Sequence, residues 1–102
     1  MSDARSALRR LTSDPTQLQA TCLDHGVALV TAFGSVLAAA GEPKDLDLGV
    51  LFDRGLPSHD ILGLIGALTD ITGFDGWDIM ALNSAGAVAR ERALIGSTVL
   101  FE

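Results

Sequence analysis

Two short motifs organise this chain, Ala32-Phe33-Gly34-Ser35 and, after nine intervening residues, Asp45-Leu46-Asp47. The first motif ends an apolar run that begins at Val27, and the second opens another that extends to Phe52. Residues two apart in a strand point to the same side, so Asp45 and Asp47 are predicted to project together. Because adjacent carboxylates repel each other unless a cation lies between them, this spacing indicates a cation-dependent role.

The composition is that of an ordinary globular domain, since 48% of the 102 residues are hydrophobic and 20% are charged. The formal net charge is −6, with thirteen acidic residues against seven lysines and arginines. Surfaces that bind nucleic acid are basic, so we expect no direct nucleic-acid binding. An acidic surface suits a basic protein partner instead.

The sequence contains one cysteine, Cys22, which excludes an internal disulfide and a cysteine-based zinc site. No run of about 18 apolar residues occurs, so no membrane span is expected. The first residues lack the apolar core of a secretory signal. These features predict a cytoplasmic protein.

Hydrophobic periodicity and breaker residues predict eight alternating elements. Helices are expected over residues 2–11, 15–25, 59–72 and 84–95, and strands over 27–33, 45–53, 76–82 and 98–101. This order predicts an α/β (α+β) fold, a small mixed β-sheet packed by helices. Residues 1–102 are expected to form one domain, with residues 1–12 as a peripheral or frayed helix. Strand polarity stays open, because βαβ and split arrangements give similar patterns.

Three helix features are specific enough to check. Asp14 followed by Pro15 is typical of a helix N-terminus. Apolar spacing in the second helix places three residues on its buried face, namely Leu18, Cys22 and Leu23. Ser84 is expected to cap the last helix, whose predicted inward residues are Ala87, Val88, Leu94 and Ile95.

A third carboxylate, Asp78, falls in the predicted strand 76–82, with Asp75 as a nearby alternative. Together with Asp45 and Asp47 it forms an oxygen-rich set of the kind that binds Mg²⁺. The Gly34-Ser35 turn can supply backbone N–H groups to a phosphate. Each feature alone is common in proteins without a function of this kind, but their combination favours a metal-dependent phosphate-binding site.

These motifs and the closing segment 94–101 resemble the minimal nucleotidyltransferases (MNT) of the DNA polymerase beta superfamily, over roughly residues 14–102. The resemblance implies that Gly34 and Ser35 contact nucleotide phosphates. It also implies that Asp45 and Asp47 bind Mg²⁺ or Mn²⁺, and that Asp78 completes the metal site or acts as a base.

Stand-alone members of this size are similar to antitoxins of HEPN/MNT toxin–antitoxin pairs. The resemblance implies that the chain transfers AMP from ATP to a hydroxyl of a HEPN-type toxin. It further implies a hetero-oligomer with that toxin.

The segment after Ser35 departs from the family, because residues 36–40 contain no arginine where the family often has them. Lys44 stands directly before Asp45, where a small polar residue is common in the family; either these departures weaken nucleotide binding, or Lys44 replaces part of the missing charge at the nucleotide. The absence of arginines keeps a second hypothesis open, an inactive antitoxin of the same fold that neutralises its toxin by binding.

Overall fold

The computed structural model describes residues 3–37, 43–53, 61–84 and 86–102, apart from the side chains of Ser35, Ala89 and Arg92. Its elements, in chain order, are α1 (Ala4–Ser13), α2 (Pro15–Asp24), β1 (Val27–Phe33), the 3₁₀ helix η1 (Gly34–Leu37), β2 (Leu46–Phe52), α3 (Ile61–Thr72), β3 (Trp77–Ala81), α4 (Ala87–Leu94) and β4 (Thr98–Phe101). The predicted strands 27–33 and 98–101 are confirmed at both ends. The predicted start of the third helix at residue 59 lies outside the described residues.

The sheet has the order β3-β2-β1-β4. β1 is antiparallel to both β2 and β4, whereas β2 is parallel to β3. The predicted mixed sheet is therefore confirmed. Its polarity, which the sequence left open, places the start of β2 beside the start of β3 and the end of β1.

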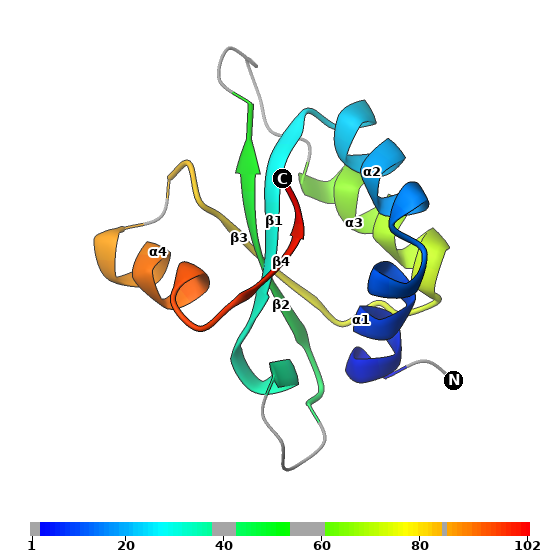
Figure 1. Cartoon of the computed structure of the whole chain (residues 1–102), viewed down its shortest axis with the longest axis horizontal. Helices are drawn as coiled ribbons and strands as arrows, with labels where there is room; N and C mark the ends of the chain where they lie inside the picture. Colours follow the sequence, from blue (N-terminus) through cyan, green and yellow to red (C-terminus); the bar gives the residue numbers. More distant parts are fainter. Residues whose placement is uncertain (1–2, 38–42, 54–60, 85) are drawn as a thin grey trace.

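Helices α1, α2 and α3 cover one face of the sheet, and α4 lies on the opposite side (Figure 1). β2 directs its apolar residues toward the three-helix face, where Leu46, Leu48 and Val50 are fully buried. Burying each such side chain contributes about 1.5–3 kcal/mol relative to leaving it exposed. This alternation leaves Asp47, Gly49 and Leu51 on the face toward α4.

The N-termini of α1 and α2 are both capped by aspartate. The Asp3 carboxylate accepts a hydrogen bond from the Ser6 N–H at 2.7 Å. Asp14 accepts one from the Thr16 N–H at 3.3 Å, and Pro15 occupies the first turn, as predicted. Leu23 was placed on the buried face of α2 by its spacing, and this prediction is wrong, because its side chain is 74% exposed.

The second face carries a smaller core in which Phe33, Leu82 and Ala93 are buried. The Thr31 hydroxyl donates to the Ala93 carbonyl oxygen at 2.9 Å and attaches α4 to the sheet. Gly49 leaves room for this contact, since a Cβ there would lie 2.8 Å from Thr31 Oγ1 and 3.3 Å from Ala93 Cβ.

Two predictions about α4 are wrong. Its N-cap is Gly86, with no side-chain cap, because Ser84 belongs to the preceding turn and its N–H donates to the Ala81 carbonyl. The predicted inward residues Ala87, Val88, Leu94 and Ile95 are all exposed. α4 contacts the sheet through Ala93, so its larger apolar residues point to solvent.

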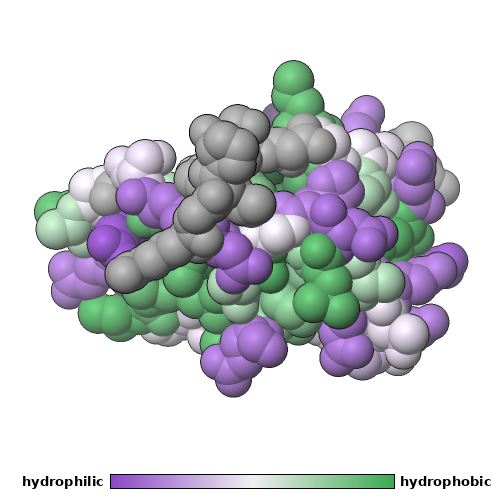
Figure 2. All heavy atoms as spheres, turned by 90° about the horizontal axis from the view of Figure 1, so that it is seen from above, coloured by the Kyte–Doolittle hydropathy of each residue, from purple (hydrophilic) through white to green (hydrophobic). Residues whose placement is uncertain are grey.

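Hydrophobic side chains reach the surface in several separate groups among hydrophilic ones on the face seen in Figure 2. Within the described residues, no helix is both long enough and apolar enough to cross a membrane.

Candidate functional site

The candidate site lies where β1 ends and β2 and β3 begin. Phe33 is opposite Asp47 in the antiparallel pair, and Asp47 is opposite Asp78 in the parallel pair. Gly34 directly follows Phe33. The register therefore brings together three residues that the sequence separates by up to 44 positions, Gly34, Asp47 and Asp78.

Gly34 lies against the carboxylate of Asp47. Its φ is +78°, a left-handed conformation that residues with a side chain rarely adopt. A Cβ built on Gly34 would overlap Asp47 Oδ2 and stand 3.3 Å from Asp47 Cγ. Glycine is therefore required both by the backbone turn and by the close approach of the carboxylate.

Asp47 and Asp78 interact directly. The pKa of Asp47 is raised above its ordinary value of 3.8, first by partial burial and then by the negative charge of Asp78. A side-chain hydrogen bond with Asp78 and the charge of Asp45 raise it further. Two carboxylates that repel across neighbouring strands favour a bound proton or cation.

The remaining predicted site residues are peripheral to this pair. Asp45 is exposed and precedes β2, and Lys44 before it is also exposed. Ser35 belongs to η1, but its side chain lies outside the described part. Asp75 is exposed and stands before β3, so Asp78 is the carboxylate that pairs with Asp47.

Among the described residues, no group of three histidine, cysteine, aspartate or glutamate side chains converges as a ready metal cage. The two facing carboxylates nevertheless fit Mg²⁺, which binds through one or two carboxylates and takes its other ligands from water and substrate phosphates. Asp45 acts on Asp47 through its charge.

A positioning residue that the sequence reasoning missed is Gly76. A Cβ there would stand 2.8 Å from the Lys44 carbonyl oxygen and 2.7 Å from Phe74 Cζ. The Gly76 carbonyl accepts a hydrogen bond from the Leu46 N–H at 2.9 Å. Gly76 thus lets the first residues of β2 and β3 approach, which sets the pairing of Asp47 with Asp78. An isolated glycine just before an apolar strand was the available signal.

The contacts of Trp77 are structural. Its ring packs edge-on against Phe74 with centroids 5.4 Å apart. The indole N–H donates to the Phe74 carbonyl at 2.8 Å and lies 3.1 Å from Thr69 Oγ1. These contacts hold the start of β3 against α3.

The fold is similar to that of solved toxin–antitoxin structures, one of which contains an MNT antitoxin. A chain of a toxin–antitoxin complex with AMP-PNP matches with a TM-score of 0.65 and 21% identity, over 86% of this chain and 73% of that chain. A mutant of the toxin–antitoxin MntA-HpeT matches with a TM-score of 0.62 and 19% identity, over 86% of this chain and 72% of that chain.

A third match is to the complex of a tri-AMPylated Shewanella oneidensis HEPN toxin with its MNT antitoxin. It has a TM-score of 0.59 and 20% identity, over 93% of this chain and 71% of that chain. No protein-family model and no curated protein sequence matches the chain. The resemblance inferred from the motifs is thus confirmed at the level of the fold.

Proposed function

We propose that this chain is an Mg²⁺-dependent nucleotidyltransferase that transfers AMP from ATP to a hydroxyl of a HEPN-type toxin and thereby acts as its antitoxin. The observation that carries the proposal is the Asp47 carboxylate held between Gly34 and Asp78. The structural neighbours support it, since one contains AMP-PNP and another a tri-AMPylated toxin. A third carries two aspartates, two positions apart, replaced by glutamate, which is the spacing of Asp45 and Asp47.

Each residue has a distinct role in this proposal. Gly34 and the N–H groups of η1 hold the nucleotide phosphates, with Ser35 and Lys44 beside them. Asp47 and Asp78 would hold Mg²⁺ or Mn²⁺, with the charge of Asp45 beside them, and the ion would neutralise charge on the pyrophosphate. Asp78 accepts the proton of the acceptor hydroxyl. The hydroxyl oxygen then bonds to the α-phosphorus of ATP, and the bond from that phosphorus to the β-phosphate bridging oxygen breaks.

The test compares Asp47→Asn with Asp53→Asn, a matched control. Asp53 follows the other end of β2 and is exposed. With a HEPN-type toxin and ATP labelled at the α-phosphate, the wild type and the control should label the toxin and raise its mass in AMP-sized steps. Asp47→Asn should lower the transfer rate at least about 100-fold, because it removes a ligand that stabilises transition-state charge.

The second candidate function is a binding antitoxin without catalysis, favoured by the absence of arginine from residues 36–40. Toxin neutralisation in the same experiment separates the two. If the wild type transfers no label and Asp47→Asn still neutralises the toxin fully, the chain acts by binding and the enzyme proposal is wrong.

A further inference from the structure

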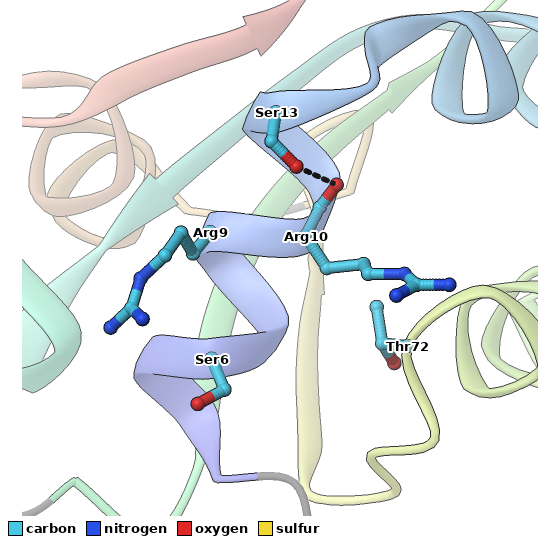
Figure 3. Close-up of a pocket in the computed structure, with 5 residues that line it drawn as sticks. All are labelled: Ser6, Arg9, Arg10, Ser13 and Thr72. Carbon is cyan, nitrogen blue, oxygen red and sulfur yellow. Dashed lines mark hydrogen bonds between the residues drawn. The ribbon is translucent and has the colours of Figure 1, made fainter.

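A hollow of about 340 Å³ lies between α1 and the end of α3, away from the acidic site. Five residues line it, namely Ser6, Arg9, Arg10, Ser13 and Thr72 (Figure 3). The four from α1 are spaced i, i+3, i+4 and i+7, so they form one continuous face of that helix. The opposite face of α1 is buried through Ala4, Ala7 and Leu11.

The hollow is cationic although the chain is acidic overall. It contains two of the seven lysines and arginines, and among the residues that the structure describes no carboxylate lines it. Asp3, at the start of α1, has a lowered pKa mainly through the hydrogen bond from the Ser6 N–H, with the Arg9 charge a smaller cause. Both guanidinium groups belong to exposed side chains and are accessible to a ligand.

The side chains diverge around the helix. In Figure 3 the Arg10 side chain extends toward Thr72, whereas Arg9 leaves the other side of α1. The Thr72 hydroxyl donates to the Leu68 carbonyl at 2.8 Å and accepts from the Phe74 N–H at 3.2 Å, so Thr72 acts as a fixed wall. The Ser13 hydroxyl makes only a long bond of 3.3 Å to the Arg10 carbonyl and can turn toward a ligand.

We propose that this hollow binds a phosphate group, either free phosphate or a phosphate monoester of a small metabolite. The Arg10 guanidinium can donate paired hydrogen bonds to phosphate oxygens, and the Ser13 hydroxyl suits an oxygen that remains, while Arg9 adds positive charge from the other side of α1. Because only the folded protein places Arg10 and Ser13 against the end of α3, phosphate binding stabilises the folded state against unfolding.

This site is separate from the candidate nucleotide site. α1 and α3 cover the face of the sheet that buries Leu46 and Leu48, whereas Asp47 alternates to the opposite face. The proposal goes beyond the proposed function and does not depend on it. Its readout is thermal stability, which a failure of AMP transfer leaves unaffected.

The experiment measures Tm against inorganic phosphate and against glycerol 3-phosphate, with sodium chloride and sodium acetate at matched ionic strength. The double variant Arg9→Gln/Arg10→Gln keeps good helix formers in α1 and removes both charges. Arg90→Gln is the matched control, since Arg90 is an exposed arginine on α4, outside the hollow.

The wild type and Arg90→Gln should show a saturable rise in Tm, about 2 °C when the phosphate concentration equals its Kd, and the double variant none. A rise with inorganic phosphate alone identifies the free ion, and a stronger rise with glycerol 3-phosphate identifies a monoester. The proposal is overturned if all three proteins respond equally, if acetate acts as well as phosphate, or if none responds.

Discussion

At the residue scale, Asp47 is the central residue of the candidate site, because it lies against Gly34 and pairs with Asp78. The sequence predicted that it shares a strand face with Asp45, because that follows from the two-residue period alone. Its pairing with Asp78 depends on β2 and β3 being parallel neighbours, which no local pattern specifies. A glycine is required at position 34 because the pairing of β1 with β2 brings the Asp47 carboxylate against it, which is also not visible in the local sequence.

The raised pKa of Asp47 predicts how stability responds to its removal. The folded protein binds the proton of the Asp47 carboxyl more tightly than the unfolded chain does. The free energy of unfolding therefore falls as the pH rises from 3.8 through the raised pKa of Asp47. Asp47→Asn should therefore be more stable than the wild type at pH 7, because it removes the repelling charge. The gain should vanish below pH 3.8. Urea denaturation across pH measures both effects.

Two comparisons make this result specific. Asp53→Asn, at the exposed end of the same strand, should not reproduce the gain. Mg²⁺ at pH 7 should stabilise the wild type more than Asp47→Asn, since it relieves the same repulsion. Equal or lower stability of Asp47→Asn at pH 7 would contradict the assigned repulsion.

At the element scale, strands were predicted better than the last helix, for a physical reason. The apolar run of β1 lies between two glycines and that of β4 follows a Gly-Ser turn, and tertiary pairing agrees with these local patterns. α4 carries its apolar residues all round, so the pattern did not show which face is buried. Its position is set instead by a small residue, Ala93, and by the hydroxyl of Thr31 from a distant strand.

The attachment of α4 should be sensitive to one hydroxyl group. Thr31→Val keeps the side-chain shape but leaves the Ala93 carbonyl without its donor, which should cost about 1–2 kcal/mol of unfolding free energy. Thr98→Val, on the exposed edge strand β4, is the control and should be nearly neutral. Denaturant unfolding gives the magnitude, and hydrogen exchange should show faster opening of α4. Identical behaviour of the two variants would rule out the anchor.

At the scale of the whole molecule, the net charge of −6 is a property that the sequence predicts fully. The cationic hollow against Thr72 could not be predicted, because α3 reaches α1 only through packing. The molecule thus combines a net negative charge with a basic depression on its helical side.

The net charge predicts the kinetics of partner binding. If the partner is a more basic HEPN-type toxin, attraction at long range should speed encounter. Raising salt from about 50 to 300 mM should then lower the association rate severalfold and change the dissociation rate much less. Stopped-flow mixing measures both rates. A salt-independent association rate would show that the overall charge does not guide the encounter.

The sheet order has a consequence for how the chain folds. β1 lies between β2 and β4, and its partner residues in β4 are about 70 positions away, as in the pair Val30 and Phe101. Closing so long a loop is slow compared with joining β1 to β2. Until β4 arrives, one edge of the apolar strand β1 has no partner, and such edges recruit other chains. A chain in which β4 has not yet paired with β1 is therefore expected to be more prone to aggregate than the native protein.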